Sequence, residues 1–132
     1  MRKYKGFASL LLVLIAIVFA VTPVLAGSTW VKTRISLKAT DNEPLASGKA
    51  IFRDRDLGLR RKLNVEVQDV ISATSVNVIV DGETVGSITL VAGTGELELD
   101  TNDGDTVPFV FAGTLVKIKN VSNGDVLLKG RN

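Results

Sequence analysis

Carboxylates and cations are the side chains of this sequence whose types and spacing could do chemistry. Its 132 residues include no histidine and no cysteine. This composition excludes serine, histidine and aspartate triads, cysteine nucleophiles, imidazole bases, and zinc or copper sites built on those ligands. We therefore expect no catalytic residue and no enzymatic activity, and a role in structure or binding instead.

One acidic loop has the composition of a calcium site, with side-chain oxygens on Asp100, Asn102, Asp103 and Asp105. Carboxylate and amide oxygens suit calcium, but an EF-hand loop needs glycine at its sixth position. Counting from Asp100, that position is Asp105. A calcium site of another kind, serving adhesion or a matrix, is the alternative to a solvated turn. No other cofactor is expected.

Two glutamates, Glu96 and Glu98, project from the same face of an expected strand. Inverting glycosidases use carboxylate pairs about 6.5 to 9.5 Å apart, so a carboxylate glycosidase is the most distant alternative. Aromatic rings that could hold a sugar are few beyond residue 26. Phe109 and Phe111 have strand spacing in an apolar setting, which indicates core packing.

A cluster of cations is the candidate binding site for an anionic partner: Arg53, Arg55, Arg60, Arg61 and Lys62. Such a cluster could hold phosphate groups or an anionic envelope polymer. Asp54 and Asp56 interrupt it. A solvated loop between two strands is therefore the alternative interpretation.

Charge is segregated along the chain. Residues 27–62 hold nine basic and four acidic side chains, residues 63–116 hold nine acidic and no basic ones, and residues 117–132 hold four basic and one acidic. If the outer blocks pair with the middle block, the charges complement one another across strands within one molecule. If they do not pair, the blocks favour head-to-tail self-association. The nearly neutral total excludes a general affinity for nucleic acid.

Apolar and polar residues alternate with a period of two along most of the chain, which predicts half-buried strands. We expect strands at 31–39, 48–53, 63–68, 76–80, 84–91, 96–100, 109–111, 115–120 and 126–128. Tight hairpins are predicted at Asp81-Gly82 and Asn123-Gly124. The predicted fold is all-β, an antiparallel β-sandwich of eight or nine short strands, with a small barrel as the second choice.

The predicted core consists of the apolar side chains on the alternating strand faces. These are Val65, Val67, Val78, Val80, Ile88, Leu97, Leu99, Phe109, Phe111, Ile118 and Leu128. Stability must come from such packing and from backbone pairing, because the chain has no cysteine to form a disulfide.

The first 26 residues are typical of a signal peptide. Arg2, Lys3 and Lys5 precede an apolar run of 12 residues at 10–21, and residues 24–26 suit signal peptidase. The run is shorter than the roughly 20 residues of a membrane-spanning helix. A retained anchor and a prepilin-type leader are the alternatives. Cleavage before Gly27 would leave one domain, 27–132, with no membrane span, in the periplasm, at the cell surface or secreted.

Several short stretches resemble the opening of chordin-type repeat domains: Leu37, 42–44, 48–52 and 63–67. The resemblance implies an extracellular β-rich module. Those domains carry histidines in the following strand region, where this chain has 76–78 without histidine, so no histidine role is implied. We therefore expect an exported, non-enzymatic structural or protein-binding module of the cell envelope or extracellular space. Its expected partner is a protein or an envelope polymer.

Overall fold

A computed structural model describes residues 29–132 of the protein. The predicted signal peptide lies outside the described residues. The eight strands are β1 (Val31–Ala39), β2 (Ser47–Arg55), β3 (Arg60–Gln68), β4 (Ser75–Val80), β5 (Glu83–Thr89), β6 (Gly95–Asp100), β7 (Leu115–Asn120) and β8 (Val126–Arg131). Two 3-10 turns, η1 (Asp56–Gly58) and η2 (Thr101–Asp103), follow β2 and β6. Within the described range, no helix is long and apolar enough to cross a membrane.

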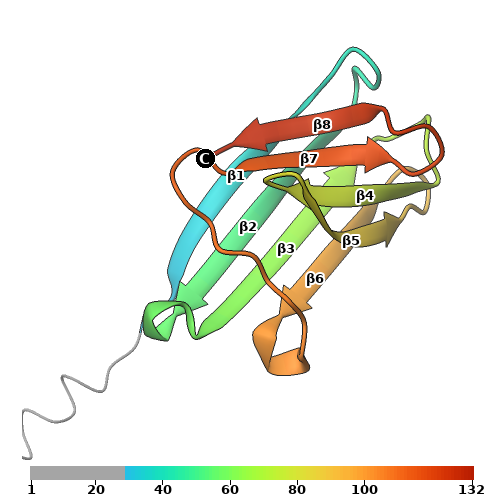
Figure 1. The fold of residues 1–132 in the computed structure, drawn as a ribbon. Helices are drawn as coiled ribbons and strands as arrows, with labels where there is room; N and C mark the ends of the chain where they lie inside the picture. Colours follow the sequence, from blue (N-terminus) through green and yellow to red (C-terminus); the bar gives the residue numbers. More distant parts are fainter. Residues whose placement is uncertain (1–28) are drawn as a thin grey trace, which may run out of the picture.

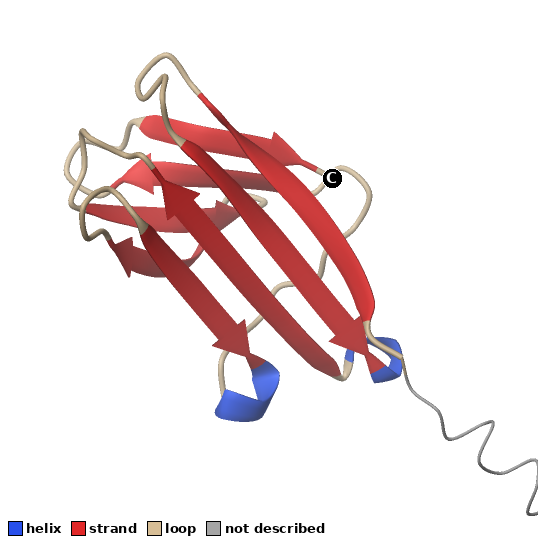
Figure 2. Ribbon diagram, turned by 180° about the vertical axis from the view of Figure 1, so that it is seen from behind, coloured by secondary structure: helices blue, strands red, loops and turns tan. Residues whose placement is uncertain are grey.

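All strand pairs are antiparallel, and the strands form one continuous sheet in the order β5-β4-β7-β8-β1-β2-β3-β6. The sheet folds over where β1 meets β8, a contact of two residue pairs. Two four-stranded layers therefore cross and pack face to face (Figure 1). Figure 2 shows the layer of β1, β2, β3 and β6 from behind. The predicted antiparallel all-β fold is confirmed, and the sheet is nearly closed, like a barrel.

The turn between β4 and β5 shows how local sequence sets this topology. Asp81 and Gly82 have φ angles of 48° and 86°. Two successive positive φ values define the tight hairpin turn that matches strand twist, and glycine adopts such values readily. The Asp81 carboxylate also accepts a hydrogen bond from the Leu115 amide at 2.9 Å, which ties this turn to β7.

The core lies between the two layers and is built from the inward face of each strand. Seven predicted core residues are buried: Val65, Val67, Val78, Val80, Ile88, Ile118 and Leu128. Leu97 and Leu99 on the edge strand β6 are half-buried against this core. The alternation of the strands was therefore a good guide to the core.

The prediction for Phe109 and Phe111 was wrong. Both lie in the irregular connection between η2 and β7, and their exposed fractions are 51% and 67%. Val107, exposed by 1%, is the buried residue of this connection instead. Pro108 has no N–H to donate to a ladder, which disfavours a strand at this point. The two rings are surface features of the molecule.

Candidate anion-binding surface

Three cationic residues lie side by side across the outer face of one layer. Lys32 of β1 is directly opposite Arg53 of β2, and Arg53 is directly opposite Lys62 of β3. Neighbouring strands are about 4.8 Å apart, so this first cation row spans about 10 Å at the backbone. Like charges in opposite positions destabilise a sheet. The repulsion within this row opposes folding, and an anion lying over the row would relieve it.

One acidic residue neutralises one end of the first cation row. Asp100 follows Lys62 in register on β6, and its carboxylate is 3.7 Å from the Lys62 ammonium and 3.2 Å from the Arg60 guanidinium. The Asn102 backbone N–H, followed by the Arg60 guanidinium, holds the Asp100 pKa below its ordinary value. Among residues 29–132, Lys32 and Arg53 form no ion pair. The β1 and β2 end of the row keeps its charge.

Three cationic side chains lie around the indole ring of Trp30, beside this row. Arg55, Arg60 and Lys62 place their charged groups 4.6, 5.3 and 5.2 Å from the centre of the Trp30 ring. Cations over an aromatic face are attracted by its quadrupole. Trp30 thus offsets part of the repulsion among these neighbours. This role was not predicted from the sequence, although Trp30 precedes Lys32 by two residues, the spacing of one strand face.

Arg61 has a different role from the other four predicted cations. It is opposite Asp54 on the other strand face, and its guanidinium lies 4.0 Å from the Phe109 ring centre. It donates hydrogen bonds to the carbonyl oxygens of Val107 at 2.8 Å and Gly58 at 2.5 Å. Arg61 therefore links two connections of the molecule. The predicted site divides into four cations on the outer face and one internal link.

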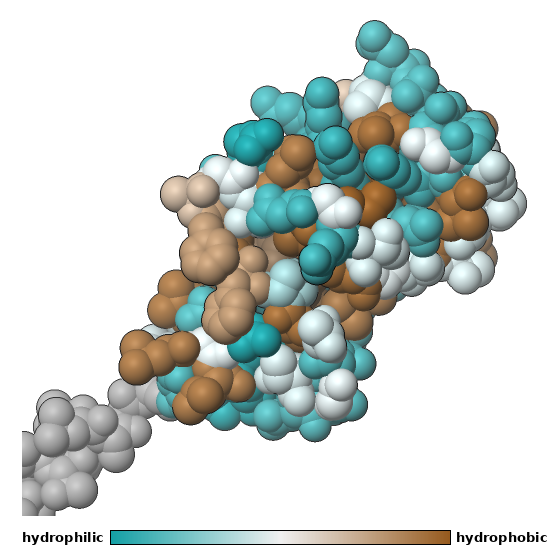
Figure 3. Space-filling view, in the orientation of Figure 1, coloured by the Kyte–Doolittle hydropathy of each residue, from teal (hydrophilic) through white to brown (hydrophobic). Residues whose placement is uncertain are grey.

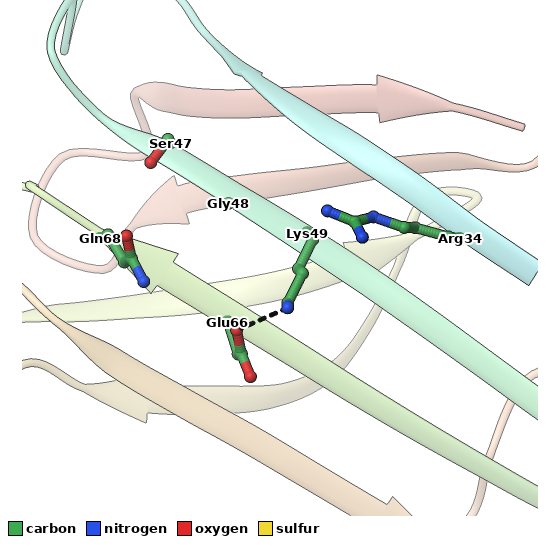
Figure 4. Close-up of a pocket in the computed structure, with 6 residues that line it drawn as sticks. All are labelled: Arg34, Ser47, Gly48, Lys49, Glu66 and Gln68. Carbon is green, nitrogen blue, oxygen red and sulfur yellow. Dashed lines mark ion pairs between the residues drawn. The ribbon is translucent and has the colours of Figure 1, made fainter.

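A shallow hollow of about 300 Å³ extends the cationic face toward the other end of β1. In Figure 4, Lys49 reaches Glu66 across the strands, with an ammonium to carboxylate distance of 3.3 Å, and Arg34 of β1 lies beside them. Arg34 forms no ion pair within the described part of the chain. The free charge thus continues along β1, while Lys49 is already paired.

Two of the three carboxylates of the predicted calcium loop, those of Asp100 and Asp105, are engaged in protein contacts. Asp100 binds the two cations named above, and Asp105 accepts a hydrogen bond from the Asp100 amide at 3.0 Å. Asn102 and Asp103 are exposed. Within residues 29–132, no group of three or more acidic side chains is placed to hold a metal ion. The calcium site stays a prediction, one that the neighbouring cations disfavour.

Glu96 and Glu98 are exposed on the outer face of β6, as the alternation predicted. Glu96 is directly opposite Glu66. The hydrogen bond that Glu96 shares with Glu98, together with the negative charges of Glu98 and Glu66, raises the pKa of Glu96. The outer face of the first layer therefore changes from basic at β1 and β2 to acidic at β6. A glycosidase role for this pair stays a prediction without further support.

Apolar side chains gather at one end of the molecule, at the lower left in Figure 3. The Phe109 and Phe111 rings stack with their centres 6.2 Å apart. Phe109 also lies against Gly58, whose neighbours Leu57 and Leu59 are exposed by 103% and 83%. Exposed apolar patches of this kind are typical of contact surfaces.

No protein-family model and no curated protein matches this chain. The resemblance to chordin-type repeat domains therefore stays a prediction.

Proposed function

We propose that the protein is an exported, non-enzymatic structural module of the cell envelope or extracellular space. It binds an acidic envelope polymer through the outer face of β1, β2 and β3. The observation that carries this proposal is the first cation row, in which Lys32 and Arg53 face each other without an acidic partner among the described residues. A polymer with repeated anionic groups would match cations that repeat at the strand spacing.

The surroundings of the row support binding of a polymer. Lys32 and Arg53 lie on an open strand face, and the shallow hollow beside Arg34 continues this face along β1, so an extended chain could lie across it. Arg53 and Lys62 are half-buried, which limits the side-chain entropy lost when an anion binds. Export is supported by the signal-peptide pattern of the sequence.

Binding of the exported protein to polygalacturonate and to long-chain polyphosphate tests this proposal. Isothermal titration at low salt should show binding that is at least about tenfold weaker after Lys32→Gln with Arg53→Gln, because two free cations are lost. The control removes a whole ion pair, Lys49→Gln with Glu66→Gln, and it should change the affinity little because the net charge of the face stays the same. Absence of binding by the unaltered protein, or equal losses in both variants, would contradict the proposal.

A calcium-dependent adhesion or matrix module is the competing proposal. Calcium titration followed by thermal melting separates the two. Binding at the loop would raise the melting temperature with calcium, and Asp103→Asn would abolish the rise. Because Asp100 is occupied by Arg60 and Lys62, we expect no such rise.

A further inference from the structure

A second row of cations begins on β1 and continues across the outer face of the other layer. Lys38 of β1 is directly opposite Lys129 of β8, and Lys129 is directly opposite Lys117 of β7. Their strand neighbours Ile118 and Leu128 are fully buried, so alternation places the lysines outward. This second cation row repeats the arrangement of the first and shares β1 with it.

Acidic partners do not neutralise the second cation row. Across β4, Lys117 is opposite Ile79 and Lys119 is opposite Asn77. Five cations of these strands form no ion pair within residues 29–132: Lys38, Lys117, Lys119, Lys129 and Arg131. The last basic block of the sequence is therefore not paired with the middle acidic block, unlike Lys49, Arg60 and Lys62. Ion pairs within the molecule therefore use only part of the segregated charge. The outer face of β7 and β8 stays positively charged.

The second cation row borders a hollow of about 460 Å³. Its lining combines cations with small and apolar groups: Lys38, Ala39, Leu115, Lys117, Lys129, Gly130 and Arg131. Hydrophilic side chains are spread over this face in Figure 3. A ligand lying in the hollow would meet positive charge from three strands at once.

A close backbone approach brings this row together. A Cβ atom at Gly130 would overlap the Ser36 backbone oxygen and lie 2.9 Å from Ile35 Cγ2. Glycine therefore lets β8 approach β1 at their two-pair contact. That contact places Lys38 opposite Lys129, although 91 residues separate them in the sequence. The row is a product of the fold and could not be seen in the spacing of the residues.

We propose that the second cation row is a second anion-binding subsite and that the two rows, joined along β1, bind one linear polyanion. This inference rests on the proposed function and specifies its ligand. Lys32 and Lys38 are six residues apart on β1, or about 20 Å at the strand rise. Arg34 lies between them on the same face. A ligand that bridges both rows must therefore be an extended polymer, because a short anion reaches one row at a time.

The number of sites for short anions and the affinity for long polymers test whether one polymer bridges both cation rows. Trigalacturonate and tripolyphosphate should bind two sites per molecule of the unaltered exported protein, and one site after Lys117→Gln with Lys129→Gln. Polygalacturonate and long-chain polyphosphate should bind the unaltered protein at least about tenfold more tightly than this variant, since the second contact is intramolecular once the first has formed. A preference between the two polymers would identify carboxylate or phosphate as the natural group.

Single substitutions provide matched controls. Lys129→Gln removes the centre of the second row and should weaken polymer binding, whereas Lys129→Arg keeps the charge and should restore it. Lys49→Gln with Glu66→Gln removes an ion pair without changing the net charge and should have little effect. Melting curves of each variant show that it is folded, and removal of a repelled lysine should not lower the melting temperature.

Three results would overturn the inference. The first is a single site for the trimers in the unaltered protein, combined with polymer binding that ignores Lys117 and Lys129. Under that result the first row alone binds, and the proposed function survives. The second is tighter binding of a DNA oligonucleotide of equal charge than of either polymer. The third is absence of binding to every polyanion, which removes the proposed function as well.

Discussion

At the scale of single residues, charge and role are separate properties. Arg61 belongs to the basic cluster in the sequence, yet its guanidinium bonds to two carbonyl oxygens and covers Phe109. An arginine side chain often contributes through packing as well as through charge. The consequence is that the connection carrying Phe109 and Phe111 is held in place while its rings face outward.

Phe111→Ala should therefore lower the free energy of unfolding by less than about 1 kcal/mol, as is usual for surface substitutions. Ile118→Ala, at a fully buried core position, should lower it by about 2 to 5 kcal/mol. Urea unfolding at neutral pH measures both. Equal losses would mean that Phe111 packs in the core after all.

Glu43 is a buried carboxylate in the connection between β1 and β2. It is 4% exposed and accepts hydrogen bonds from the Ile71 amide at 2.8 Å and the Ser72 amide at 3.1 Å. The Ser72 hydroxyl also donates to it. That hydroxyl, followed by these amides, holds the Glu43 pKa below its ordinary value of 4.5 despite the opposing effect of burial. Glu43 thus fastens the loop after β3 to the loop after β1.

Because the pKa of Glu43 is lower in the folded state, its contribution to stability is present above pH 4.5 and is lost as the pH falls through the lowered value. Glu43→Gln should cost about 1 to 3 kcal/mol at neutral pH. The cost should shrink in strong acid, where the native carboxyl is protonated too. Urea unfolding at pH 7 and at pH 3 measures the difference. The exposed Glu96→Gln is the control and should not lower stability at neutral pH. A cost for Glu43→Gln that is equal at both pH values would contradict this account.

At the scale of strands, register decides which charges meet. Lys49 faces Glu66 across β2 and β3, whereas Lys117 faces Lys129 across β7 and β8. The same residue type therefore stabilises one strand pair and destabilises the other. A binding function would account for retaining the unfavourable pair, since sites for ligands commonly reduce stability.

Lys117→Glu should raise the melting temperature at low salt, because it replaces a repulsive strand pair by an attractive one. The gain should be no more than about 1 kcal/mol. It should fade near 1 M salt, where the screening length is about 3 Å. Lys49→Glu should have the opposite effect, because it removes the partner of Glu66. A lower melting temperature for Lys117→Glu at low salt would indicate an acidic partner for Lys117.

At the scale of the whole molecule, local patterns predicted the elements well and their assembly poorly. Eight of the expected strands exist, and the Asp81-Gly82 hairpin follows from backbone sterics alone. The bend at β1 and β8 and the pairing of β3 with β6 join residues that are distant in sequence. Such contacts carry no local signal, so the nearly closed sheet could not be predicted in detail.

The candidate site shows the same division. The cluster from Arg53 to Lys62 was visible because its members are neighbours in the sequence. The opposition of Lys32 to Arg53, the ring of Trp30 and the whole second cation row depend on strand order. Part of the first row and the charge blocks could therefore be predicted from the sequence, whereas the positions of these charges relative to one another depend on the fold.

The meeting of β5 and β6 has a consequence for solubility. A closed barrel has no edge strands, whereas this sheet has two, β5 and β6. They pack against each other through side chains, and the approach is close, because a Cβ atom at Gly86 would lie 2.7 Å from the Leu97 side chain. Parting these strands would uncover backbone groups able to pair with another molecule. Glu83, Glu96 and Glu98 place negative charge on both edges, so copies repel one another there. As the pH falls, Glu96 would lose its charge at a higher pH than an ordinary glutamate, because its pKa is raised. Aggregation of partly opened molecules would then begin where β5 and β6 meet.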